Sequence, residues 1–64
     1  MMTPAALKAA RTRLGFTQRS LAARLGVSRR TVIRYEAGDR PVPGPVKGMI
    51  EMLLLNSPAV NRPS

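Results

Sequence analysis

The chain has 64 residues, and its 11 lysines and arginines outnumber its 3 aspartates and glutamates, which gives a formal net charge of +8. It contains no cysteine and no histidine, which excludes disulfides and removes the usual zinc ligands and the usual general base. The acidic side chains left to an enzyme are Glu36, Asp39 and Glu51, and we expect no enzymatic activity, no metal and no cofactor. The length allows one small domain, which we expect over residues 1–56, followed by a flexible tail over 57–64.

The positive charge predicts an anionic partner. Nine of the cations are arginines, whose guanidinium groups can bind phosphate or guanine through two parallel hydrogen bonds. The composition therefore favours nucleic acid, although a genome rich in guanine and cytosine also raises the arginine content.

The sequence gives no sign of secretion or membrane insertion. Pro4, Lys8 and the arginines that follow interrupt the first apolar stretch, so it does not resemble a signal peptide. The longest apolar stretch, residues 49–55, contains Glu51 and is far shorter than the roughly 20 residues of a transmembrane helix. We expect a cytoplasmic protein without a small-molecule ligand.

Two short helices are expected in the first 25 residues. Thr3 followed by Pro4 is typical of an N-cap and a first helical position, and the apolar spacing predicts a helix from there to Leu14. Thr17 is a second candidate N-cap, and the second helix should end at Gly26. The residues expected to face the core from these helices are Leu7, Ala10, Leu14, Leu21, Ala22 and Leu25.

Residues 26–28 separate the second helix from a third and are typical of the turn in a helix-turn-helix. Ser28 should cap the third helix, which extends to about Ala37. A proline-rich loop follows over 38–43, and a fourth helix begins at 44. The predicted buried face of this fourth helix consists of Val46, Ile50, Leu53 and Leu54. No segment alternates apolar and polar residues with the period of a strand, so the fold class is all-α.

The third helix has two faces of opposite character. At about 100° per residue, Arg29, Arg30 and Arg34 fall within one arc of about 140°. Val32 and Tyr35 lie on the opposite arc, where they can pack against a core. A short helix with a cationic front and an apolar back, preceded by a tight turn, fits the major groove of DNA.

Arginines on one helix face are more often simply solvated, but the charge pattern here favours a contact with DNA. Neither Arg29 nor Arg30 has an acid four residues later, and Arg30 and Arg34 repel each other at that spacing. The phosphates along a DNA groove would relieve this repulsion, and arginine can contact O6 and N7 of guanine. Ile33 is expected either to touch a thymine methyl group or simply to be exposed.

The sequence of residues 17–28, TQRSLAARLGVS, and that of residues 31–38, TVIRYEAG, together resemble the helix-turn-helix of Cro and the phage repressors, the XRE family. The resemblance covers residues 7 to about 55. It implies a compact, phage-repressor-like domain of four to five helices around a central helix-turn-helix. The proline-rich loop 41–45 departs from the family pattern, as does the short segment after the fourth helix, where many members continue into a fifth.

The resemblance also implies roles for individual side chains. It places Gln18 against a DNA phosphate, and it pairs Arg11 with Glu36 so that the first helix is tied to the third. The residues expected to contact bases are Arg29, Arg30, Ile33 and Arg34. Those expected on phosphates are Arg11, Thr17, Gln18, Ser28 and Arg40.

The fourth helix carries more apolar residues than one face can bury. Met49, Met52 and Leu55 lie away from its predicted buried face, so they either complete a thin core or form the seam of a dimer. We favour the dimer. A two-fold dimer would place two copies of the third helix in successive major grooves about 34 Å apart, on a near-palindromic operator.

We therefore expect a bacterial or phage transcription regulator, most simply a repressor, that binds specific double-stranded DNA as a homodimer and is associated with the nucleoid when bound. The alternative is a protein-interaction module, such as an antitoxin or a phage accessory factor, whose fourth helix binds a partner and whose DNA contact is secondary. A cationic membrane-active peptide is disfavoured because the cations spread over three helices instead of one amphipathic face.

Overall fold

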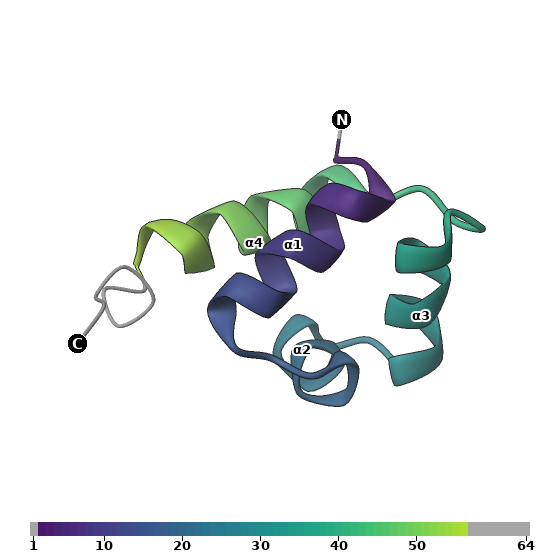
Figure 1. Ribbon diagram of the computed structural model, residues 1–64, viewed down its shortest axis with the longest axis horizontal. Helices are drawn as coiled ribbons and strands as arrows, with labels where there is room; N and C mark the ends of the chain where they lie inside the picture. Colours follow the sequence, from purple (N-terminus) through teal and green to yellow (C-terminus); the bar gives the residue numbers. More distant parts are fainter. Residues whose placement is uncertain (1, 57–64) are drawn as a thin grey trace.

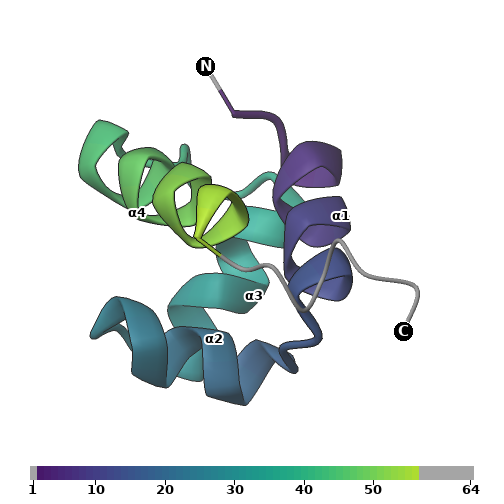
Figure 2. The same cartoon turned by 90° about the vertical axis from the view of Figure 1, so that its left-hand side faces the viewer.

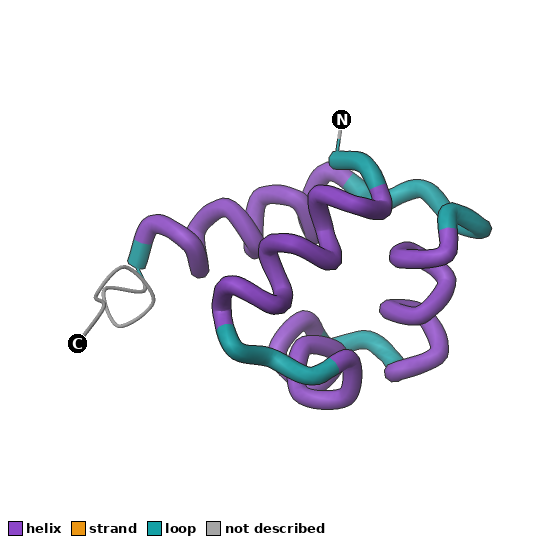
Figure 3. Tube along the Cα trace, viewed as in Figure 1, coloured by secondary structure: helices purple, strands orange, loops and turns teal. Residues whose placement is uncertain are grey.

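The computed structural model describes residues 2–56, and the expected tail over 57–64 lies outside the described residues. Four helices follow one another along the chain: α1 (Pro4–Leu14), α2 (Gln18–Leu25), α3 (Arg29–Ala37) and α4 (Gly44–Leu55) (Figure 1). Residues 2–56 contain no strand, and short loops connect the helices (Figure 3). The all-α fold class predicted from the sequence is confirmed, with four helices in the described part of the chain.

The helices begin and end where local signals in the sequence place them. Thr3 Oγ1 accepts a hydrogen bond from the N–H of Ala6 at 3.0 Å, and Ser28 Oγ accepts one from the N–H of Thr31 at 3.2 Å. Each bond satisfies one of the N–H groups that the first turn of a helix leaves without a partner. At the start of α2, Thr17 and Ser20 cap each other. Thr17 Oγ1 accepts from the N–H of Ser20 at 3.0 Å, and Ser20 Oγ accepts from the N–H of Thr17 at 2.9 Å.

The turn between α2 and α3 depends on a glycine. Gly26 adopts a φ of 76°, in the left-handed region that side chains with a Cβ rarely enter. The N–H of Gly26 donates to the carbonyl of Ala23 at 3.3 Å, and the N–H of Val27 donates to that of Ala22 at 3.0 Å. These bonds cap α2 and redirect the chain, so that α3 packs directly across α2.

One apolar core lies between the four helices. Figure 2 shows α1 and α4 on one side of the molecule and α2 on the other, with α3 packed against both α1 and α2. The buried residues are Leu7, Ala10, Leu21, Ala22, Leu25, Val32, Tyr35, Val42, Val46 and Ile50. In α1 and α2 these residues are those expected from the helical spacing, apart from Leu14, which is half-buried.

The fourth helix and the loop before it differ from the prediction in detail. Val46 and Ile50 are buried, but Leu53 and Leu54 are only half-buried, because the C-terminal half of α4 extends beyond the other helices (Figure 1). Val42 is buried although the sequence predicts only a loop over 38–43. An apolar residue between two prolines is the one local signal for this contact.

Candidate nucleic-acid interface

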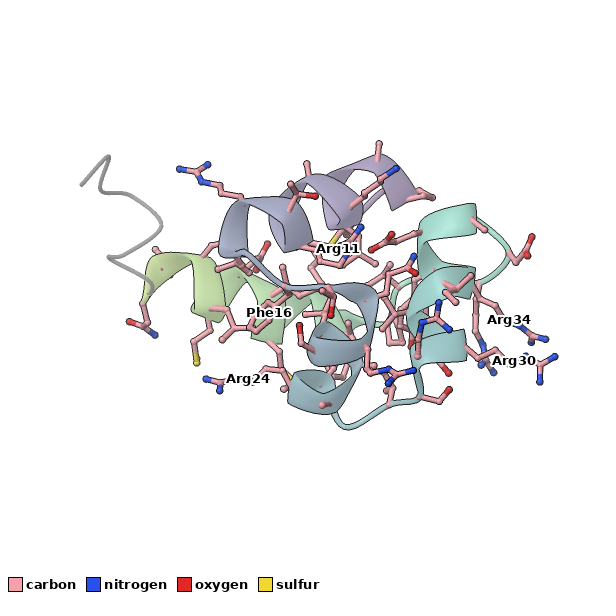
Figure 4. All side chains as sticks on the ribbon, turned by 60° about the horizontal axis from the view of Figure 1, so that its bottom comes forward. Arg11, Phe16, Arg24, Arg30 and Arg34 are labelled. Atoms are coloured by element: carbon pink, nitrogen blue, oxygen red, sulfur yellow. The ribbon has the colours of Figure 1, made fainter. Side chains whose placement is uncertain are left out.

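The outward face of α3 consists of arginines. Val32 and Tyr35 anchor the helix in the core, with exposed fractions of 0% and 5%. Arg29, Arg30 and Arg34 are exposed, and within residues 2–56 their side chains take part in no hydrogen bond and no ion pair. Figure 4 shows Arg30 and Arg34 projecting from the end of the molecule where α3 lies. As the helical spacing predicts, α3 has a buried apolar face and an opposite, exposed cationic face.

Ile33 lies among these arginines and is half-buried. It is therefore partly accessible beside the guanidinium groups. A thymine methyl group is the kind of base atom that such an apolar side chain can contact.

Glu36 is the centre of a hydrogen-bonded group where α1, α2 and α3 meet. Arg11 donates to it from Nε, 2.6 Å from Oε2, and from Nη2, 3.3 Å from Oε1. Gln18 Nε2 donates to Oε1 at 3.2 Å. The Arg11 and Glu36 side chains are only 15% and 6% exposed. A charge pair so far removed from water is sensitive to the loss of either member, because the other charge then stays buried without compensation.

The sequence predicts two roles for Arg11, an ion pair with Glu36 and a contact with a DNA phosphate. The ion pair with Glu36 is present in the structure, and the third nitrogen of Arg11, Nη1, donates to the carbonyl of Phe16 at 3.0 Å. All three guanidinium nitrogens therefore donate within the protein. Figure 4 shows Arg11 inside the molecule beside α3, far from the exposed guanidinium groups of Arg30 and Arg34. We accordingly assign Arg11 a structural role, and its contact with a DNA phosphate stays a prediction.

Two contacts of this group have no clear signal in the sequence. The Phe16 carbonyl accepts from Arg11, and Gln18 donates to Glu36, which lies 18 residues further along the chain. The resemblance links Arg11 to Glu36 but assigns Gln18 only to a phosphate. A contact between residues this far apart depends on how α2 crosses α3, which local spacing does not determine.

The first turns of α2 and α3 offer backbone N–H donors. Thr17 and Ser28, both expected on phosphates, use their hydroxyl oxygens to accept from the backbone of their own helices. The N–H groups of the first two residues of each helix have no acceptor in that helix. Such N–H groups, together with the helix dipole, favour an anion.

The remaining candidate residues are exposed. Arg40 lies in the loop after α3 and is exposed. On α4 the exposed fractions are 41% for Met49, 63% for Met52 and 83% for Leu55. The structure thus leaves these three apolar side chains outside the core of a single chain.

Other kinds of site find no support in the described part of the chain. Residues 2–56 contain no group of three or more acidic, cysteine or histidine side chains that could hold a metal ion. None of the helices in this part of the chain has the length and hydropathy of a transmembrane segment.

The short α2, the tight turn at Gly26 and the exposed arginines of α3 define a helix-turn-helix DNA-binding domain. The sequence model of the helix-turn-helix family matches residues 7–46. The chain belongs to this family, in its XRE branch of Cro and repressor-like proteins, and is a regulator that binds double-stranded DNA. The family is a regulatory one and not a family of enzymes. No match was found among curated proteins or among solved structures.

Proposed function

We propose that the protein is a sequence-specific transcription repressor that inserts α3 into the major groove of its operator. The observation that carries the proposal is the free cationic face of α3, held outward by the buried Val32 and Tyr35. Arg29, Arg30 and Arg34 contact base edges there, and guanine is the base that arginine binds best through O6 and N7. Repression follows from occlusion of the DNA by the bound protein.

A second set of groups fixes the position of α3 on the DNA backbone. The N-terminal turns of α2 and α3, with Thr17, Gln18 and Ser28, face one phosphate each, and Arg40 contacts another from the loop after α3. Gln18 can serve both partners, because its amide carries a second N–H beyond the one that Glu36 accepts. These contacts position the protein without selecting a sequence.

We further propose that two copies act together. Met49, Met52 and Leu55 are exposed apolar residues on α4, and together they offer a surface for a second copy. A two-fold dimer places its two α3 helices in successive major grooves about 34 Å apart, on a near-palindromic site.

Selection of bound duplexes from a random pool tests this function. The expected result is a short motif that contains guanine in each half and is repeated with two-fold symmetry one helical turn away. A pool that yields no motif, while binding stays salt-sensitive, would contradict sequence-specific repression.

The exposed face of α4 also supports a second candidate, a protein-interaction module whose DNA contact is secondary. Gel filtration combined with DNA titration separates the two functions. Self-association and salt-sensitive, specific duplex binding support the repressor. A monomer that binds all duplexes weakly supports the interaction module.

A further inference from the structure

The outward face of α4 has the pattern of a coiled-coil seam. Pro45, Gly48, Met52 and Leu55 follow one another at spacings of three, four and three residues, which is the spacing of the a and d positions in a heptad. At about 100° per residue all four lie within an arc of about 80°. The buried Ile50 lies on the opposite side of the helix. The seam therefore faces away from Ile50, and Met52 at one edge of it borders Leu14, Phe16 and Arg24.

Gly48 is not explained by packing within one chain. It lies in the interior of α4, where glycine destabilises a helix relative to alanine. A Cβ at this position would meet no atom within 4 Å. The fold of a single chain thus has room for a side chain at 48, and the glycine leaves a notch between the exposed Met52 and the start of the helix.

The charge distribution favours a second copy over another kind of partner. The two charged residues of α4, Lys47 and Glu51, form an ion pair with each other at 3.1 Å. By contrast, α1 carries three cations, α2 carries two, and α3 carries three with a single acid. Two chains that each carry a net charge of +8 repel least where they meet through the neutral helix. An acidic partner would instead be attracted to the cationic surfaces.

We propose that α4 pairs with α4 of a second copy in antiparallel orientation, with Met52 of each copy seated over Gly48 of the other and Leu55 over Pro45. This proposal rests on the dimer suggested above and specifies its contact, with Met52 and Leu55 in the seam and Met49 just beyond its edge. A parallel pair would place Gly48 on Gly48 and leave the notch empty. The antiparallel pair fills both notches and makes the same contacts twice, as a two-fold interface requires.

The contact is small and leaves the DNA-binding surface free. A helix of 12 residues is about 18 Å long, so the seam falls among the weaker protein interfaces. The exposed half of α4 extends away from α3 (Figure 1). The free protein therefore associates weakly, and two copies on one operator associate much more strongly because the DNA raises their effective concentration.

Two substitutions at one position test the notch. Gly48→Leu adds apolar surface to α4 but fills the notch, so we expect the dissociation constant of the dimer, measured by sedimentation equilibrium, to rise about tenfold. Gly48→Ala is the matched control and should change it much less. In both variants the melting temperature at low concentration should stay equal or rise, since a Cβ at 48 meets no atom within 4 Å and a glycine in a helix interior is destabilising. Tighter association of Gly48→Leu, or a parent chain that remains monomeric at millimolar concentration, would overturn the proposal.

The absence of cysteine permits a test of orientation. In the antiparallel pair, positions 45 and 55 of opposite copies are adjacent, whereas the two copies of position 55 lie about 15 Å apart along the helix. A mixture of the Pro45→Cys and Leu55→Cys chains should therefore form the mixed disulfide dimer on oxidation, and neither chain should form one alone. Efficient cross-linking of Leu55→Cys to itself would contradict the antiparallel arrangement.

Binding to a duplex that holds a single half-site separates this proposal from the proposed function. Gly48→Leu should bind the half-site as tightly as the parent chain and lose affinity only for the full operator. If the parent chain binds no half-site specifically but still dimerises through α4, the repressor function is wrong and the seam stands. If it binds the half-site and does not dimerise, the seam is wrong and the function stands.

Discussion

The junction of α1, α2 and α3 and the outward face of α3 both use arginine, with opposite consequences. At the junction, Arg11 is almost buried and donates to Glu36 and to a backbone carbonyl. On the outward face, Arg30 and Arg34 are exposed and have no partner within the described chain. The same side chain stabilises the fold in the first region and remains available to DNA in the second. The two regions differ because Arg11 is buried beside an acid, whereas the arginines of α3 are exposed and have no acid within reach in residues 2–56. Substitutions in the first region should therefore affect stability, and those in the second should affect DNA binding.

The largest effect is expected from the acid at the junction. Glu36→Ala leaves the Arg11 charge nearly buried and without its partner, so the free energy of unfolding should fall by about 3 kcal/mol. Urea denaturation followed by circular dichroism measures this change. Asp39→Ala is the matched control, because it raises the net charge equally but removes an exposed carboxylate. Similar losses in the two variants would show that net charge matters and that the buried pair does not.

The exposed arginines of α3 should affect recognition and leave stability nearly unchanged. We expect Arg34→Ala to lose about 1 to 3 kcal/mol of discrimination at one base pair of the operator. Titration of duplexes that carry each base pair at that position measures the discrimination. Arg24→Ala removes the same charge at the opposite end of the molecule (Figure 4) and should leave base preference unchanged.

Arg40 should contribute affinity without sequence preference. Arg40→Ala is expected to weaken binding to all duplexes alike and to reduce the slope of log affinity against log salt by about 0.9, the value for one lost phosphate contact. Fluorescence anisotropy at several salt concentrations gives both quantities. If Arg40→Ala and Arg34→Ala gave the same uniform loss, the division between residues that contact bases and those that contact phosphates would be wrong.

The smallest effect is expected on α4. Lys47 and Glu51 form an ion pair one helical turn apart, but their side chains are 39% and 53% exposed. Exposed pairs at this spacing contribute about 0.3 to 0.5 kcal/mol. Glu51→Ala should therefore change the melting temperature only slightly, and high salt should remove the difference. A loss as large as that for Glu36→Ala would mean that exposure does not govern these ion pairs.

The helices themselves were predictable because their signals are local. Thr3, Thr17 and Ser28 each lie next to a helical apolar pattern, and a residue that caps its own helix depends on no distant part of the chain. The two faces of α3 follow for the same reason, since a helix fixes the angle between successive side chains. The placement of Val32 and Tyr35 in the core is confirmed.

The contacts between helices were less accessible to sequence analysis. Spacing alone does not show that Gln18 reaches Glu36, that Phe16 offers its carbonyl to Arg11, or that Val42 enters the core from a loop. Each of these depends on the angle and distance at which two helices pack. The structural role of Arg11 became clear only from its contacts with Glu36 and with the Phe16 carbonyl.

The sequence by itself determined the four helices, the turn at Gly26, the cationic face of α3 and the resemblance that identifies the family, because all of these depend on residues close together in the chain. The tertiary structure decided which charges are buried in pairs and which are free, and it left Gly48 and its neighbours on an open face of α4. Those features depend on packing between distant segments, which sets the distance between a donor and its acceptor and decides which surfaces remain exposed to solvent.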